Sequence, residues 1–172
     1  RRPNGLQLQK VSVPLGVILI IYESRPNVTS ECASLCFKSG NSVILRGGRE
    51  AYYSNHAIAN VFRRVYRRYG IPEACCTVLA TTDHSAIDHL LEMSDHINLV
   101  IPRGGETLIR RVAEKSKIPV IKHYKGICHV YIDRDADIKQ AVKIAINAKC
   151  QRPSVCNAME TLLVHKGIAK KV

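Results

Sequence analysis

The sequence predicts an α/β fold, a doubly wound parallel sheet, followed by the beginning of a second α/β domain. Short apolar runs alternate along the chain with longer amphipathic segments, as buried strands alternate with helices in such sheets. The strongest run, Val17–Tyr22, reads VILIIY and has the unbroken apolar character of a strand buried on both faces. The alternation restarts near Gly126, so we expect one domain over residues 1–125 and a second over residues 126–172.

The elements after the first strand are predicted from turn residues and from periodicity. Pro26 disfavours helix at the residue before it, so a loop at 23–27 precedes a helix from about Thr29 to Lys38, which Gly40 ends. Further strands are expected near 41–45, 77–79, 97–101, 128–132 and 161–165, and further helices near 51–69, 85–93, 106–115 and 136–148.

The expected helix at 51–69 is the longest, and its apolar residues share one side. They recur at helical spacing, so we expect this side to face the core. The residues concerned are Ile58, Val61, Phe62, Val65 and Tyr69.

Charge and cysteine content narrow the class of protein. The net charge of +12 suggests anionic partners, but its main cluster lacks aromatic interleaving and any nucleic-acid-binding motif, so we favour a solvated helix face or an interface. No apolar run approaches the ~20 residues of a membrane helix. The seven cysteines are odd in number and lack zinc-ligand spacing, which predicts reduced thiols, a cytoplasmic protein and no metal site. The charge cluster comprises Arg63, Arg64, Arg67 and Arg68.

Cys156 is the candidate nucleophile. It follows a Pro153-Ser154 turn, between a segment predicted as helix and one predicted as strand. A thiol at such a junction can lie near backbone N–H groups that favour its thiolate form. The alternative is that Cys156 is a small buried apolar residue, as free cysteines often are. Cys150 is the rival thiol, and we interpret it as a packing residue.

Five blocks of sequence resemble one family in the same order along the chain. They are VPLGVILIIYESRPNVT at 13–29, KSGNSVILRGG at 38–48, IPRGG at 101–105, GICHVYID at 126–133 and NAKCQRPSVCNAMET at 147–161. The chain resembles the gamma-glutamyl phosphate reductases (glutamate-5-semialdehyde dehydrogenases) of the aldehyde dehydrogenase superfamily. The resemblance implies an aldehyde dehydrogenase-like fold with a Rossmann-type cofactor domain, and an internal fragment of a longer enzyme.

The resemblance also implies a reaction. Members of the family use NADPH to reduce L-glutamyl 5-phosphate to L-glutamate 5-semialdehyde, with release of phosphate, in proline biosynthesis. The cysteine that Cys156 matches forms a thioester, which a hydride can reduce. A cytoplasmic location, a homo-oligomer and a partner kinase that makes the labile acyl phosphate are expected on the same ground, with no membrane and no nucleic acid involved.

The resemblance assigns site residues to three groups. Cys156 and Asn27 are the expected catalytic residues, Asn27 as a side-chain donor to the oxyanion. Arg152 and Asn157 are expected to bind substrate. The residues expected to bind NADP(H) follow three strands, and Arg46 with Arg49 would select the 2'-phosphate; the set is Arg46, Gly47, Gly48, Arg49, Arg103, Gly104 and Gly105.

Several alternatives remain open at this point. Asn27 fits a helix cap as well as an oxyanion donor. Arg152 fits the phosphate or a carboxylate of the substrate, or a pairing with a surface acid. His123 stands where hydrolytic relatives carry a glutamate, and a structural histidine is the favoured interpretation. The alternative functions are a basic nucleotide- or RNA-binding module without catalysis, and an inactive fragment of the enzyme.

Overall fold

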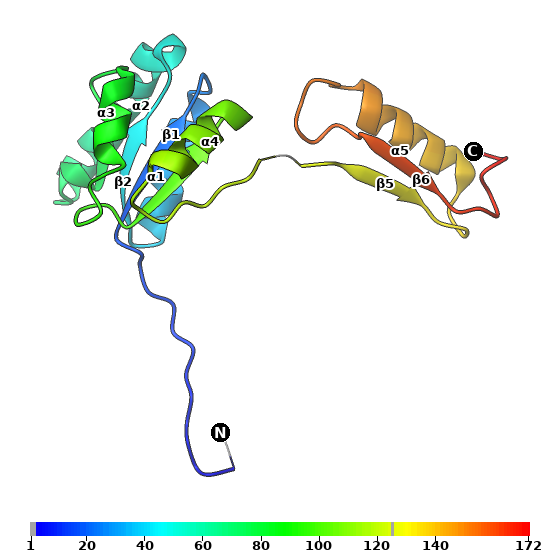
Figure 1. The fold of residues 1–172 in the computed structure, drawn as a ribbon, viewed down its shortest axis with the longest axis horizontal. Coiled ribbons are helices and arrows are strands. Elements are labelled where there is room, and N and C mark those ends of the chain that lie inside the picture. Colours follow the sequence, from blue (N-terminus) through cyan, green and yellow to red (C-terminus); the bar gives the residue numbers. More distant parts are fainter. Residues whose placement is uncertain (1–2, 125) are drawn as a thin grey trace. The chain divides into compact units, whose positions relative to one another are not determined.

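The first unit of the chain is built on a parallel sheet of four strands, seen in the computed structural model of the protein (Figure 1). The structure describes residues 3–124 and 126–172. The strands are β1 (Val17–Tyr22), β2 (Ser42–Arg46), β3 (Cys76–Val78) and β4 (Leu99–Arg103), in the order β3-β2-β1-β4. In the register, Ile18 lies beside Val43 of β2 and Leu99 of β4. The strand order therefore reverses between β1 and β4.

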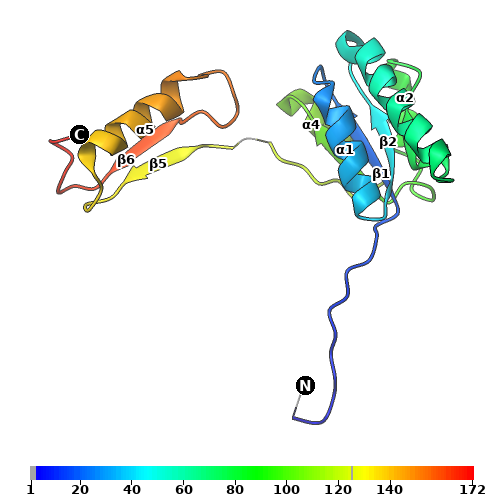
Figure 2. The same ribbon diagram turned by 180° about the vertical axis from the view of Figure 1, so that it is seen from behind.

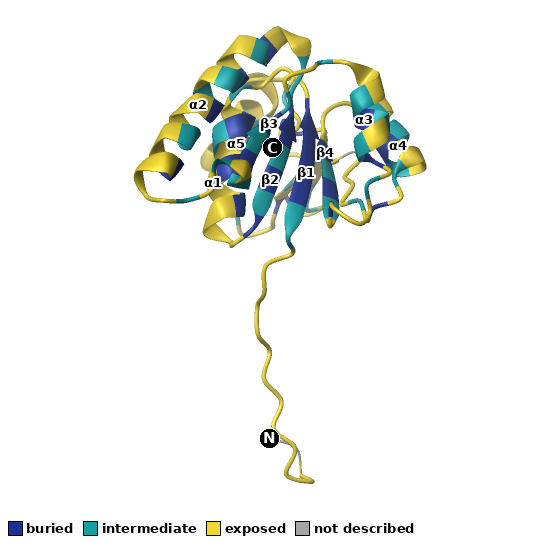
Figure 3. Ribbon diagram, turned by 90° about the vertical axis from the view of Figure 1, so that its left-hand side faces the viewer, coloured by how far each residue is buried: buried dark blue, intermediate teal, exposed yellow. Residues whose placement is uncertain are grey.

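Helices cover both faces of this sheet, as Figure 3 shows. Helices α1 (Asn27–Lys38) and α2 (Tyr52–Arg68) pack on one face, and α3 (His84–Leu90) and α4 (Glu106–Lys115) on the other. Side chains of β1 alternate between the two cores: Ile18 and Ile20 face α1 and α2, and Leu19 and Ile21 face α3 and α4. This period of two in a strand buried on both sides confirms the predicted doubly wound α/β fold.

The predicted elements are all present, with ends that differ by a few residues. Short 3-10 turns at Arg49–Ala51 and Glu73–Cys75 precede α2 and β3. Helix α1 starts at Asn27, two residues earlier than expected, and ends before Gly40, whose φ of 76° is the left-handed conformation that glycine adopts most readily. The predicted helix end at Gly40 is confirmed.

The predicted core face of α2 is correct for Phe62, half-buried at Ile58, and wrong for Val61, Val65 and Tyr69. Val61, Val65 and Tyr69 are exposed, with 49%, 46% and 70% of their surface accessible. The buried side of α2 instead carries Asn55, Ala59 and Tyr66, with Phe62 packed against the core beside them. The helix packs through a small residue, one aromatic residue and a hydrogen-bonded amide, so its most apolar stripe faces away from the sheet.

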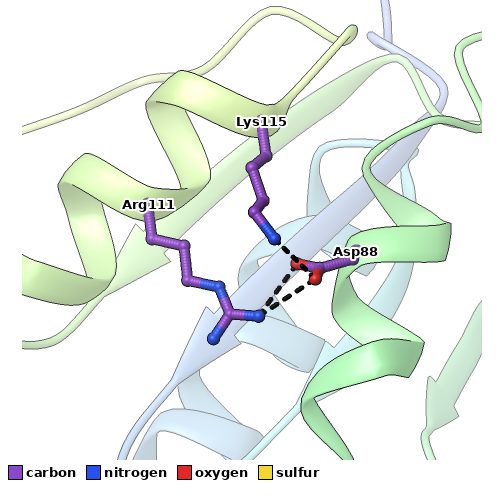
Figure 4. A network of polar contacts seen from close by, with 3 residues as sticks. All are labelled: Asp88, Arg111 and Lys115. Carbon is purple, nitrogen blue, oxygen red and sulfur yellow. Dashed lines mark hydrogen bonds and ion pairs between the residues drawn. The ribbon is translucent and has the colours of Figure 1, made fainter.

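On the other face of the sheet, charged side chains join α3 to α4. Asp88 of α3 accepts hydrogen bonds from Arg111 and Lys115 of α4, with the Lys115 Nζ at 2.7 Å (Figure 4). Hydrogen bonds from Lys115 and Arg111, and their positive charges, lower the pKa of the Asp88 carboxyl against a smaller opposing effect of desolvation.

A short extension of the sheet lies at the outer edge of β4. Val120 forms a parallel bridge with Val100. The N–H of Val100 donates to the carbonyl of Pro119 at 2.9 Å, and the N–H of Ile121 donates back to Val100 at 3.0 Å. The first unit ends directly afterwards, at Lys122.

The second unit begins at His123 and contains one β–α–β motif. Strands β5 (His129–Ile132) and β6 (Thr161–Val164) pair in parallel, and α5 (Ile138–Cys150) lies beside them (Figure 2). Asp137 caps α5 by accepting the N–H of Gln140 at 2.8 Å. The core of the second unit is small, and its buried cluster consists of Ile132, Ala141 and Ile168. The expected domain boundary between residues 125 and 126 stays a prediction.

No helix in residues 3–124 or 126–172 is long and apolar enough to cross a membrane. Within the same residues no three histidine, cysteine or acidic side chains gather as a metal site would require.

Candidate active site

The predicted cofactor residues lie together at the carboxyl edge of the four-stranded sheet. Arg46 ends β2 and Arg103 ends β4, and a pair of glycines follows each of them. In open α/β sheets, ligands bind outside the carboxyl ends of the strands where the strand order reverses, which here is between β1 and β4. The fold therefore gathers at one edge residues that are up to 59 positions apart in the sequence, from Arg46 to Gly105.

Glu23 occupies the reversal point, and sequence reasoning missed it. Its carboxylate accepts the backbone N–H of Gly105, at the N-terminus of α4, at 3.2 Å. Gly104 makes this approach possible, because a Cβ there would lie 2.6 Å from the carboxyl carbon of Glu23. The only signal in the sequence was a charged residue directly after a buried strand.

Arg46 is buried, with 6% of its surface exposed. One guanidinium nitrogen donates to the carbonyl of Thr82, and its Nε has no hydrogen-bond partner among the described residues. Burial lowers the pKa of this guanidinium. In this position the Arg46 side chain holds the segment after β3. It does not extend into solvent, as a guanidinium that binds a phosphate group would.

Arg49, by contrast, is exposed and lines a cleft of about 330 Å³. The other walls come from the start of α2 and the loop after β3, where the hydroxyl of Tyr52 donates to Ala80. The cleft combines a guanidinium, phenol rings and hydroxyl groups; its lining residues are Arg49, Tyr52, Tyr53, Ala80, Thr81 and Thr82.

A buried series of hydrogen-bonded polar side chains supports the carboxyl edge of the sheet, and it was not predicted. The hydroxyl of Tyr22 lies 2.7 Å from Thr29 Oγ1, and Thr29 Oγ1 donates to Asn55 Oδ1 at 3.0 Å. Gly47 lies against the chain, because a Cβ there would collide with the Asn55 amide and would reach 3.1 Å from the Tyr22 ring. The glycine thus has a packing role in addition to its predicted place near the cofactor.

Asn27 is the first residue of α1 and is exposed. Its amide donates to the carboxylate of Glu31 at 3.0 Å, and the cap position belongs to Pro26, with no side chain bonded to the helix end. The interpretation of Asn27 as a helix cap is therefore wrong. Its role as an oxyanion donor stays a prediction.

Cys156 lies in the loop between α5 and β6, and its side chain is exposed. The interpretation of Cys156 as a buried apolar residue is therefore wrong. Its backbone carbonyl accepts a hydrogen bond from the Cys128 thiol at 3.4 Å. Among the described residues none accepts the N–H of Cys156, although the amides of Val155 and Ala158 on either side are bonded within the loop. Cys150 is also exposed, so its interpretation as a packing residue is wrong too.

The two predicted substrate residues line a second cleft, of about 450 Å³, beside the cysteine loop. Arg152 and Asn157 lie in the loop, and the last turns of α5 form the other wall. Val155 and Asn157 contribute to the lining, but Cys156 between them does not. The complete lining is Asn147, Ala148, Gln151, Arg152, Val155, Asn157 and Ala158.

A family model described as the aldehyde dehydrogenase family matches residues 4–172. The chain belongs to the aldehyde dehydrogenase family. Within this family it is 58% identical to the gamma-glutamyl phosphate reductase of Rhodopirellula baltica, over 98% of this chain and 39% of the relative. It is also 58% identical to the reductase of the same name from Colwellia psychrerythraea, over 99% of this chain and 41% of the relative.

Solved structures of the family agree. The crystal structure of gamma-glutamyl phosphate reductase from Thermotoga maritima matches with a TM-score of 0.80 and 47% identity, over 92% of this chain and 38% of that chain. This aldehyde dehydrogenase family chain spans about two fifths of the length of the relatives it matches. The resemblance seen in the five sequence blocks is confirmed.

Proposed function

We propose that the whole protein containing this chain is an NADPH-dependent reductase of L-glutamyl 5-phosphate in proline biosynthesis. Residues 1–125 would bind the dinucleotide, and residues 126–172 would begin the catalytic domain. The identity of 55–58% to gamma-glutamyl phosphate reductases over nearly the whole chain supports the substrate. The observation that carries the mechanism is that Cys156 is exposed and that its backbone N–H has no acceptor among residues 3–124 and 126–172.

The chemistry proposed for Cys156 has two stages. Its thiolate attacks the acyl carbon of the acyl phosphate, the carbon–oxygen bond to phosphate breaks, and a thioester remains on the sulfur. A bound nicotinamide would supply the hydride that reduces this thioester. Cys156 would then leave as the thiolate when the carbon–sulfur bond breaks, releasing the semialdehyde. Both tetrahedral species carry an oxyanion, and the Cys156 N–H is available to donate to it, with Asn27 as the proposed second donor.

The described residues fit a dinucleotide at the carboxyl edge of the first unit. Arg49 offers a guanidinium for a phosphate group beside the rings and hydroxyls of its cleft. The proposed site also keeps Gly47, Gly48, Arg103, Gly104 and Gly105. Arg46 would contribute to it by holding the loop after β3 through Thr82, and not by contacting a phosphate group. A pyrophosphate at the α4 N-terminus would take the Gly105 N–H from Glu23, because two anions cannot share that donor without repulsion.

The reverse reaction on the full-length protein tests the function. We expect NADPH to form from semialdehyde and NADP only when phosphate is present. Cys156→Ser should abolish this activity and leave NADPH binding unchanged, and Cys150→Ser, at the other exposed thiol, should retain it. NADPH formation independent of phosphate would contradict the proposed reaction, and an active Cys156→Ser variant would contradict the nucleophile.

The cofactor preference is tested by Arg49→Ser. We propose that NADP is favoured over NAD because the exposed guanidinium of Arg49 can donate two parallel hydrogen bonds to the 2'-phosphate. Initial rates with NADPH and NADH should show the preference for NADPH reduced in this variant. An unchanged preference would remove Arg49 from the proposed site.

The proposed location is the cytoplasm, and the proposed assembly is a homo-oligomer that receives its acyl phosphate from a glutamate kinase. Cross-linking of the two full-length enzymes during turnover, compared with cross-linking in the absence of ATP, tests the kinase as a partner.

A further inference from the structure

The cleft beside the cysteine loop has a lining that suits one particular part of an amino-acid substrate. Four of its seven lining residues are polar, namely Asn147, Gln151, Arg152 and Asn157. We propose that this cleft binds the α-amino-acid group of the substrate, with the α-carboxylate on Arg152 and the α-ammonium on the amide oxygens. This inference rests on the proposed function and adds Asn147 and Gln151 to the substrate site.

The charge of the cleft favours a zwitterionic group. Among its described lining residues Arg152 alone is charged, and no described carboxylate lies within ion-pair distance of its exposed guanidinium. The planar guanidinium matches the two oxygens of a carboxylate. Each side-chain amide offers one acceptor oxygen and two donors, so the three amides can bind an ammonium without adding a negative charge. A phosphate dianion would leave a second charge uncompensated by a single cation.

The position of the cleft favours the same end of the substrate. Val155 and Asn157 line the cleft, and the Cys156 between them does not. The acyl carbon and its phosphate must lie at the sulfur when the thiolate attacks. The α-carbon is separated from the acyl carbon by two methylene groups, so the group held a residue away from the thiol is the α-amino-acid end. Ala148, Val155 and Ala158 provide apolar surface for these methylenes.

Truncated aldehydes test the inference in the reverse assay on the full-length protein. The aldehydes are L-glutamate 5-semialdehyde, 5-oxopentanoate without the amino group, 4-aminobutanal without the carboxylate, and butanal without either. For Arg152→Met we expect kcat/KM to fall roughly 10- to 100-fold with the two carboxylate substrates, as expected for a lost charged hydrogen bond. With butanal and 4-aminobutanal it should change by less than about threefold, which also shows that the variant is folded.

Asn147→Ala and Gln151→Ala should instead weaken binding of the α-ammonium group. They should lower kcat/KM for L-glutamate 5-semialdehyde roughly 3- to 10-fold and leave that for 5-oxopentanoate unchanged, since one neutral hydrogen-bond partner is lost. The matched control is Lys149→Gln, which removes an exposed charge from the same turn of α5 outside the cleft and should change none of the four values.

Two results would overturn the inference while leaving the proposed function intact. One is an Arg152→Met variant whose KM for phosphate rises and whose kcat/KM falls equally for all four aldehydes, which places the guanidinium on the phosphate. The other is an Arg152→Met variant indistinguishable from wild type. A wild-type protein with no phosphate-dependent activity would instead contradict the proposed function.

Discussion

The thiols of this chain occupy two kinds of environment, and the difference bears on which of them can act. Burial raises the pKa of Cys32 and of Cys76, each to about 11, and burial raises that of Cys36 as well. Cys150 and Cys156 are exposed. Because the thiolate is the reactive form, burial makes these three thiols of the first unit unreactive, whereas the second unit exposes two thiols to solvent.

Alkylation should separate these thiols. At pH 8 a thiol with a pKa of about 11 is only about 0.1% thiolate, so we expect iodoacetamide to modify Cys156 and Cys150 at least ~100-fold faster than Cys32 or Cys76. Peptide mass spectrometry over time measures the rates. The same reaction in urea provides the control, since all seven thiols should then react alike. Modification of Cys32 at the rate of Cys156 in the folded protein would contradict this prediction.

Two buried tyrosines should respond in opposite ways to loss of the hydroxyl. Tyr66 has no hydrogen-bond partner for its hydroxyl among the described residues, and burial raises its pKa to about 12. Tyr22 bonds to Thr29. We expect Tyr66→Phe to leave the free energy of unfolding unchanged or raise it by about 1 kcal/mol, and Tyr22→Phe to lower it by about 1 kcal/mol. Urea unfolding followed by circular dichroism measures both, and equal destabilisation would contradict the assigned contacts.

At the scale of the elements, α3 and α4 are joined by Asp88 and its two cationic partners. The folded-state pKa of Asp88 is lowered, chiefly by the hydrogen bond from Lys115. The carboxylate therefore stabilises the folded state above its unfolded pKa, near 4, and this contribution is lost as the pH falls through the lower folded-state pKa.

Asp88→Asn should lower the free energy of unfolding at pH 7, and the difference from wild type should shrink as the pH falls below about 4. Added salt should shrink it as well, because the partners are partly exposed. The control is Glu92→Gln, whose pairing with Lys117 at 3.8 Å is exposed on both sides and should matter little. A difference that stayed constant from pH 7 to pH 2.5 would rule out the electrostatic origin.

The elements were predictable from the sequence where hydrophobicity decided them, and α2 shows where it did not. Val61 and Val65 were expected to be buried. Asn55 is buried instead, because Thr29 of α1 donates a hydrogen bond to its amide oxygen. The loop that carries Cys156 is exposed, and its role as the nucleophile's loop stays a prediction. Glu23 was missed because its partner Gly105 is 82 residues away, and the burial of Arg46 depends on a carbonyl that only the folded loop supplies.

At the scale of the whole chain, the two units differ in how much core they contain. The first has buried clusters on both faces of its sheet. The second has one helix on two strands and buries few side chains, with Leu162 and Leu163 of β6 left 42% and 47% exposed. Small units with little buried apolar surface are marginal by themselves.

Expressing the two units separately should show this difference in core size as a difference in stability. We expect residues 1–122 to unfold cooperatively on heating and residues 123–172 alone to show no cooperative transition. The reason is that the described part of the first unit buries apolar side chains on both faces of its sheet, whereas the described part of the second has one small buried cluster. Circular dichroism and calorimetry measure the transitions. The intact chain serves as the reference, and a cooperative transition in the isolated second unit would contradict the argument.

The bridge between Val100 and Val120 determines how the chain would respond to force. Two backbone hydrogen bonds tie the last residues of the first unit to the edge of its own sheet. Tension applied through the second unit would therefore reach the sheet at Val100 before it reached any helix, and detachment would begin by peeling Pro119–Ile121 from β4. The first unit therefore ends at a fixed point on the edge of its own sheet.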